Sequence, residues 1–118
     1  MTGRVRLAVV GAGIMGTNHV RVSKSVPSLE LAAVVDRDLA RARGAAPAGV
    51  RVVSDLADVL DDIDAAVVSV PTPFHVETAV ALISAGKHVL VEKPLADDLD
   101  DAIALVELAG RSPGVLVC

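Results

Sequence analysis

Short apolar runs rich in β-branched residues alternate with helical patterns along nearly the whole chain. The runs that predict strands are 6–10, 31–35, 50–53, 65–70, 88–91 and 114–117. Between them, apolar residues at helical spacing predict helices over 14–25, 39–44, 56–60, 76–85 and 99–109. This alternation is typical of right-handed βαβ units, which build a parallel sheet. We therefore expect an α/β fold, a doubly wound parallel sheet of about six strands in the order 3-2-1-4-5-6.

The composition favours one domain with an aliphatic core. A chain of 118 residues supports a single core, so 1–118 is expected to form one domain. Phe74 is the only aromatic residue, which leaves Val, Leu, Ile and Ala to fill that core. The net charge of −4, with no basic face and no aromatic residues for stacking, argues against nucleic-acid binding.

No apolar run approaches the roughly 20 residues of a membrane helix, so no membrane partner is expected. The single cysteine, Cys118, offers no internal disulfide and no metal-ligand spacing, and we expect no metal site. Two arginines precede the apolar N-terminal segment, as in a signal peptide. The three glycines inside that segment fit a loop between a strand and a helix better. A cytoplasmic location is the expectation.

The predicted helix over 99–109 has the clearest pattern. Leu99, Ala102, Ile103 and Val106 recur at helical spacing and so define its apolar face. Four aspartates lie in or just before its first turn, where they complement the positive end of the helix dipole: Asp97, Asp98, Asp100 and Asp101.

A glycine-rich segment joins the first predicted strand to the first predicted helix. It has the pattern G-x-G-x-x-G and consists of Gly11, Ala12, Gly13, Ile14, Met15 and Gly16. The first glycine permits a tight turn, the second lets the backbone approach a diphosphate, and the third lets the helix pack close to the strand. The free N–H groups at the helix start would face the phosphates. The strand–loop–helix context predicts a dinucleotide site, whereas the glycine pattern alone is weak evidence.

An acidic residue completes this fingerprint. Asp36 ends the second predicted strand and follows Gly16 by 20 residues, as expected of an acid that accepts hydrogen bonds from the adenosine ribose. Its charge would repel a 2′-phosphate, so NAD is favoured as the cofactor. NADP stays possible, because Arg37, Arg41 and Arg43 follow. Arg37 could stack on adenine or pair with a 2′-phosphate, and the alternative is that all three arginines line a solvated helix face.

Two further segments end predicted strands on the far side of the crevice. Pro71, Thr72 and His75 follow the fourth strand and could contact the cofactor, although His75 could instead be a solvated residue at a helix start. Glu92, Lys93 and Pro94 follow the fifth strand, and the proline limits the direction of the lysine side chain. Of the other histidines, His19 is interpreted as a surface or packing residue rather than a ligand, and His88 as structural.

In this order, GAGIMG, Asp36, PTPFH and GKHVLVEKPL resemble the N-terminal domain of the glucose–fructose oxidoreductase / inositol dehydrogenase / MocA (Gfo/Idh/MocA) family, over essentially the whole chain. The resemblance implies an NAD(P)-dependent dehydrogenase that acts on a secondary alcohol, or the corresponding ketone, of a sugar or cyclitol. It implies that Lys93 is the catalytic lysine, hydrogen-bonded to the reacting oxygen. Glu92 and Pro94 would then shape the nicotinamide pocket, and Thr72 and His75 would line the cofactor.

Members of the family also carry a second domain, which binds the substrate and supplies an Asp-x-x-x-His pair, and homo-oligomers are expected of them. Residues 1–118 contain no such pair. We therefore expect this chain to be the dinucleotide-binding domain without the C-terminal substrate domain, and to bind cofactor without turnover. Two other functions stay open. One is a non-catalytic NAD(P)-binding sensor, which has no need of Lys93; the other is a methyltransferase, which Gly16 and the E-K-P segment disfavour.

Overall fold

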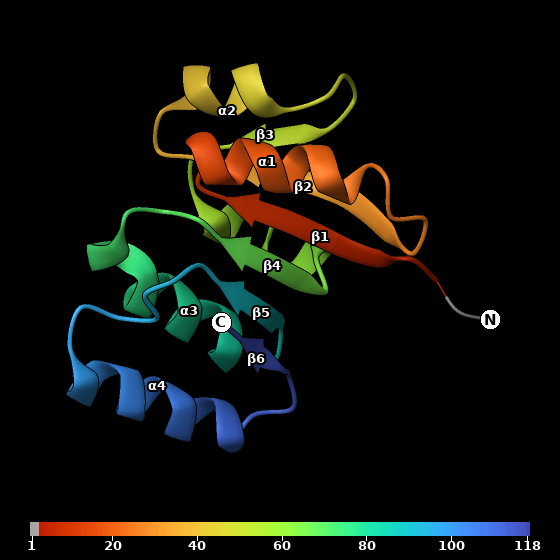
Figure 1. Cartoon of the computed structure of the whole chain (residues 1–118). Coiled ribbons are helices and arrows are strands. Elements are labelled where there is room, and N and C mark those ends of the chain that lie inside the picture. Colours follow the sequence, from red (N-terminus) through yellow and green to blue (C-terminus); the bar gives the residue numbers. More distant parts are fainter. Residues whose placement is uncertain (1–2) are drawn as a thin grey trace.

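The computed structural model describes residues 3–118, and within them six parallel strands form one sheet in the order β3-β2-β1-β4-β5-β6 (Figure 1). The predicted fold class and strand order are confirmed. The strands are β1 (Val5–Val10), β2 (Leu29–Val35), β3 (Arg51–Val53), β4 (Ala65–Val68), β5 (His88–Val91) and β6 (Leu116–Val117). The strand order reverses between β1 and β4, which is where ligands of doubly wound sheets bind.

Helices cover the sheet in two layers, with α1 and α2 on one side and α3 and α4 on the other (Figure 1). Their bounds are α1 (Ile14–Ser23), α2 (Leu39–Ala45), α3 (His75–Ser84) and α4 (Leu99–Gly110). The segment predicted as one helix over 56–60 forms two short 3₁₀ turns instead, η1 (Leu56–Asp58) and η2 (Leu60–Asp62). Val59 separates them, because its backbone leaves the helical region while its side chain is buried. A third 3₁₀ turn, η3 (Thr72–Phe74), precedes α3.

The core consists of two aliphatic clusters, one on each face of the sheet. Successive residues of β1 alternate between them: Ala8 and Val10 belong to the larger cluster, and Leu7 and Val9 to the smaller. Burial on both faces explains why the central strands consist almost entirely of Val and Ala.

Helix α4 forms where it was predicted, but it buries a different face. Leu99 is 73% exposed, and Ile103 and Val106 are about half exposed, whereas Leu105 is 1% exposed. The apolar spacing therefore predicted the helix correctly, but it predicted the wrong buried face. Contact with α3 selects the side of Leu105 and Leu108.

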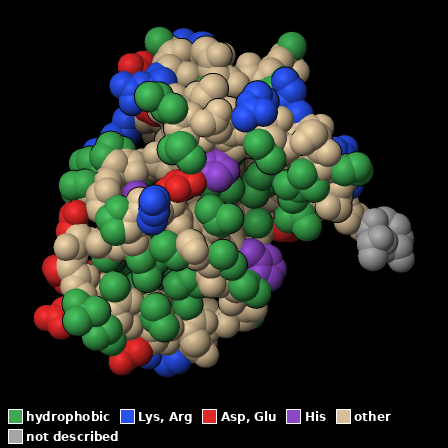
Figure 2. Space-filling model, in the orientation of Figure 1, with side chains coloured by type: hydrophobic (Ala, Val, Ile, Leu, Met, Phe, Trp, Pro, Cys, Tyr) green, Lys and Arg blue, Asp and Glu red, His purple; other side chains and the backbone are tan. Residues whose placement is uncertain are grey.

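An apolar hollow of about 450 Å³ lies beside α1, over the strands from β1 to β6. Figure 2 shows hydrophobic side chains gathered on this face of the molecule. Its lining includes Leu7, Val67, Leu90 and Val117, together with His19 from α1. No helix of the described residues is both long and apolar enough to cross a membrane.

Candidate dinucleotide site

The glycine loop turns directly from β1 into α1. Gly11 has a φ of 99°, in the left-handed region that favours glycine. A Cβ on Gly16 would lie 1.7 Å from the carbonyl oxygen of Gly11, so the start of α1 packs against the loop as closely as only glycine allows. A Cβ on Gly13 would meet no atom of the described part of the chain within 4 Å. The loop therefore leaves open space beside Gly13, where a diphosphate would have to approach the backbone.

The first turn of α1 leaves its positive end free for an anion. Gly13 is the N-cap and supplies no side-chain hydrogen bond, and no acidic residue lies in that turn. The backbone N–H groups there point out of the helix. Together with the open space at Gly13, this is the arrangement that binds phosphate groups.

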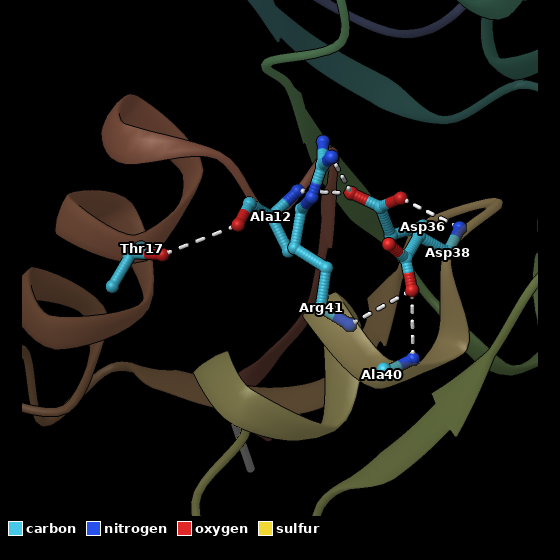
Figure 3. Close-up of polar contacts among 6 residues, drawn as sticks. All are labelled: Ala12, Thr17, Asp36, Asp38, Ala40 and Arg41. Atoms are coloured by element: carbon cyan, nitrogen blue, oxygen red, sulfur yellow. Dashed lines mark hydrogen bonds and ion pairs between the residues drawn. The ribbon is translucent and has the colours of Figure 1, made fainter.

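Asp36 lies against the glycine loop at the end of β2 (Figure 3). Its Oδ2 accepts a hydrogen bond of 2.9 Å from the backbone N–H of Ala12, and its Oδ1 accepts one of 2.8 Å from Asp38. Each carboxylate oxygen has a second lone pair, so hydroxyl donors can still be bound. The side chain is 11% exposed, which leaves it accessible at the edge of the cleft. Its position is thus fixed before any ligand binds.

The arginines after Asp36 have different partners. Arg37 reaches across to the other half of the sheet, where its guanidinium carbon lies 4.5 Å from the ring centre of Phe74 and Nη2 donates a 3.2 Å hydrogen bond to Glu77. Arg41, in α2, lies 4.0 Å from Oδ2 of Asp36 (Figure 3). Arg43, also in α2, is exposed, does not line the cleft and makes no side-chain hydrogen bond or ion pair with another described residue. Two of the three arginines thus lie at the candidate site.

A cleft of about 970 Å³ separates the two halves at the carboxyl ends of the strands. Of the predicted site residues, it is lined by Gly11, Ala12, Gly13, Asp36, Arg37 and Pro71. Other lining residues were not predicted: Arg41, Ser54, Asp55, Ser69, Val70, Phe74, Glu77 and Thr78 are among them. The buried hydroxyl of Ser69 has no hydrogen-bond partner among residues 3–118. The sequence signal for Ser69 and Val70 was their place at the carboxyl end of the predicted strand 65–70, which in the structure ends at Val68.

His75 lies behind the cleft rather than on its wall. It is 2% exposed, so the alternative of a solvated residue is wrong. Nδ1 lies 2.8 Å from the carbonyl oxygen of Pro94, and Nε2 lies 2.8 Å from that of Val70. Both ring nitrogens therefore have protein partners, and the expectation that His75 contacts the cofactor needs correction. Thr72, in η3, is half-buried and is not among the residues that line the cleft.

The E-K-P segment leaves the sheet where β5 ends. The N–H of Glu92 donates to the carbonyl of Val68, which extends the pairing with β4 by one residue. The Glu92 carboxylate contacts Nε2 of His19, from α1, and both side chains are about three-quarters buried. Lys93 and Pro94 are exposed. His19 is thus partly a packing residue, as interpreted, with a polar partner that the sequence did not indicate.

A glycine loop with an open approach, an acid anchored beside it and a cleft at the switch point of a doubly wound sheet define a dinucleotide-binding domain of the Rossmann type. Comparison with known families agrees with this class. Residues 5–117 match the family model described as "Oxidoreductase family, NAD-binding Rossmann fold" (Gfo/Idh/MocA), and the chain belongs to that family.

Similar proteins are dehydrogenases. An inositol 2-dehydrogenase of Rhodococcus erythropolis is 42% identical over 108 residues, which are 87% of this chain and 31% of that protein. A 4-carboxy-2-hydroxymuconate-6-semialdehyde dehydrogenase of Sphingobium is 37% identical over 122 residues, 97% of this chain and 37% of the relative. The chain therefore spans about a third of the length of the curated relatives that it matches.

Two solved structures of similar proteins contain the cofactor. GenD2 from gentamicin A biosynthesis, in complex with NAD, superposes with a TM-score of 0.93 at 38% identity over 99% of this chain and 34% of its own. The WlbA dehydrogenase of Bordetella pertussis, in complex with NADH and UDP-GlcNAcA, has a TM-score of 0.86 at 29% identity over 96% of this chain and 36% of its own.

Proposed function

We propose that residues 1–118 are the cofactor-binding domain of an NAD-dependent dehydrogenase that acts on a secondary alcohol of a sugar or cyclitol. The observation that carries the proposal is Asp36, anchored on the glycine loop by the N–H of Ala12 at the edge of the cleft. The Rhodococcus relative is named as an inositol dehydrogenase, and WlbA was solved with a UDP-sugar. These names support a ring alcohol as the substrate class.

The residues present suit a nicotinamide dinucleotide. The loop would hold the diphosphate through backbone N–H groups, since nothing fills the space beside Gly13. Asp36 would accept hydrogen bonds from the adenosine ribose, and Arg37 and Pro71 would bound the adenine half of the cleft. Ile14, Met15 and Thr72 stay predicted cofactor neighbours. When bound, the cofactor would supply the hydride acceptor of the reaction.

Lys93 is the proposed catalytic residue. It follows β5, the neighbour of β4 beyond the switch point, and its exposed side chain stands between Glu92 and Pro94. Its ammonium group would hydrogen-bond the reacting oxygen of the substrate and stabilise negative charge that develops there. The substrate itself would be bound by a part of the protein that corresponds to the remaining length of the relatives. Homo-oligomer formation and a cytoplasmic location stay predictions.

NAD is the proposed cofactor in preference to NADP, for an electrostatic reason. A 2′-phosphate would place its negative charge against the carboxylate of Asp36. Arg37, which could offset that charge, is already paired with Phe74 and Glu77, and Arg41 lies beside Asp36 itself. Binding NADP would require these contacts to rearrange.

Titration of the chain with NADH and with NADPH, followed by cofactor fluorescence, tests the proposal. Asp36→Ala is expected to weaken NADH binding by about 1.5–3 kcal/mol, roughly tenfold or more, because hydrogen bonds to a charged acceptor are lost. Asp36→Asn keeps the shape and removes the charge, so the gap between NADH and NADPH should narrow. Asp61→Asn, on the exposed turn η2, is the control and should change neither affinity. Tighter binding of NADPH than of NADH by the unaltered chain would contradict the choice of cofactor.

A further inference from the structure

Two histidines, from helices on opposite faces of the sheet, contact the residues on either side of Lys93. His19 lies in α1 and contacts the carboxylate of Glu92. His75 lies at the start of α3, and its Nδ1 contacts the carbonyl oxygen of Pro94. Figure 1 shows α1 and α3 on opposite sides of the sheet to which β5 belongs. The segment is therefore held from both faces, one residue before Lys93 and one residue after it.

The contact of His75 also connects two loops. Its Nε2 lies 2.8 Å from the carbonyl oxygen of Val70, at the end of β4, while Nδ1 faces the loop after β5. The ring is 2% exposed, so water does not compete for either nitrogen. A neutral imidazole donates one of these hydrogen bonds and an imidazolium donates both. Both partners are carbonyl oxygens, so only the imidazolium, with an N–H on each nitrogen, hydrogen-bonds the Pro71 loop and the Lys93 loop together; the neutral ring hydrogen-bonds one carbonyl and contacts the other.

Backbone contacts complete the attachment on both sides of Lys93. The N–H of Glu92 still pairs with Val68 of β4, and Leu95 packs against the larger aliphatic cluster. Pro94 has no N–H to donate. The chain is thus fixed at Glu92 and again at Pro94 and Leu95, and the exposed side chain of Lys93 lies between these fixed points.

We infer that His19 and His75 are positioning residues, which hold the Lys93 segment in the orientation that the lysine needs to act at the nicotinamide end of the cleft. The inference rests on the proposed function of Lys93. Neither histidine lines the cofactor cleft, so neither needs to touch the cofactor. Small displacements of a catalytic group have large effects on reaction, which is why a lysine on a loop requires such support.

The chain contains three lysines, Lys24, Lys87 and Lys93, which makes the placement of Lys93 directly measurable. Reductive methylation with ¹³C-formaldehyde gives one dimethylamine NMR signal for each lysine and one for the N-terminal amine, and the signal that Lys93→Arg removes is that of Lys93. In the unaltered chain, adding NAD⁺ is expected to move the Lys93 signal and to leave the signals of Lys24 and Lys87 in place. This readout requires no turnover.

Three variants test the two histidines. His75→Phe and His19→Leu should leave the Kd for NAD⁺ within about threefold of the unaltered chain, and should reduce the NAD⁺-induced shift of the Lys93 signal to roughly half or less. His75→Gln keeps an N–H donor and should restore part of that shift. His88→Gln is the matched control. That histidine accepts a 3.0 Å hydrogen bond from Val115 at the opposite end of β5, so its loss should leave the Lys93 response unchanged.

The outcomes separate the inference from the proposal on which it rests. If NAD⁺ binds the unaltered chain without moving the Lys93 signal, the proposed role of Lys93 fails, and the inference fails with it. If the signal moves equally in the unaltered chain and in the folded His19 and His75 variants, the positioning role alone is refuted. His19 is only partly buried, so His19→Leu keeps the test decisive even if His75→Phe does not fold.

Discussion

Gly13 and Gly16 belong to one loop, yet the structure predicts opposite consequences for replacing them with alanine. At Gly16 the new Cβ would lie 1.7 Å from the carbonyl oxygen of Gly11 and 2.7 Å from its carbon. At Gly13 it would meet nothing within 4 Å. The first substitution therefore disturbs the folded chain itself, and the second disturbs only what the loop binds.

The cost of Gly16→Ala follows from that distance. Both contacted atoms are backbone, so no flexible side chain can move aside, and α1 has to shift away from β1. Overpacking of this kind costs about 1–3 kcal/mol and occasionally more. In a domain of this size, each kcal/mol lowers the melting temperature by about 4 °C. We expect Gly16→Ala to melt at least several degrees below the unaltered chain and to bind NADH weakly, because the loop is displaced.

Gly13→Ala should leave stability within about 0.5 kcal/mol of the unaltered value, since its φ of −75° suits alanine and only the capping preference of glycine is lost. If the diphosphate approaches the backbone here, the methyl group should weaken NADH binding by about 1.5–3 kcal/mol, as hydrogen bonds to the charged phosphates are lost. Gly44→Ala in α2, where a Cβ also meets no atom within 4 Å, is the control and should keep full affinity.

Circular dichroism on heating measures the stability of all three variants, and NADH fluorescence titration measures their affinity. The two measurements should separate the variants, because Gly13→Ala should lose affinity for NADH and keep its thermal stability. A Gly13→Ala chain that binds NADH as tightly as the unaltered chain would falsify the assignment of the diphosphate to this loop. A Gly16→Ala chain of unchanged melting temperature would refute the magnitude worked from the contact distances.

Two predictions concern stability away from the cleft. Hydrogen bonds from Arg6 lower the pKa of Asp64 from 3.8 to about 2. Asp64→Asn should therefore lower the free energy of unfolding by up to about 1 kcal/mol at pH 7, a value kept small because the side chain is 40% exposed. The loss should have its full size above pH 3.8 and disappear as the pH falls through about 2. Urea unfolding at several pH values measures it. Leu105→Ala should cost about 2–5 kcal/mol in the same assay, whereas Leu99→Ala, at a 73% exposed position, should cost under about 0.5. Equal costs for the two leucines would contradict the observed orientation of α4.

The strands and their order could be predicted because the central strands β1 and β4 are buried on both faces and each strand is a short, mainly apolar run rich in β-branched residues. Alternation with helices then limits the connections to right-handed crossovers. The buried side of α4 could not be predicted in the same way. Leu99, Ile103 and Val106 have the spacing of an apolar face, but contact with α3 decides which side is covered, and that contact depends on where the preceding loops place the helix.

Within the site, the residues that could be predicted are those whose role depends on their own backbone or on their place at a strand end. The glycine loop and Asp36 are of this kind. His75 is of the other kind, because its two partners, the carbonyl oxygens of Val70 and Pro94, are backbone atoms without a sequence signature. Arg37 is similar. The sequence places it next to Asp36, but it does not predict the contact with Phe74, 37 residues further along the chain, which the tertiary structure creates.

Gly11 connects the two halves of this site. A Cβ there would lie 2.5 Å from the backbone carbon of Ser69, so the loop after β1 and the end of β4 are in direct backbone contact. The N–H of Ser69 also donates to Val10, and the N–H of Gly11 donates to Val35. Val70 follows Ser69 and accepts from His75, which in turn reaches the Lys93 segment. A continuous set of short contacts thus joins the loop proposed for the diphosphate to the segment proposed for catalysis. If these two proposals hold, the positions of the cofactor and of Lys93 would be set by one connected edge of the sheet rather than by two independent loops.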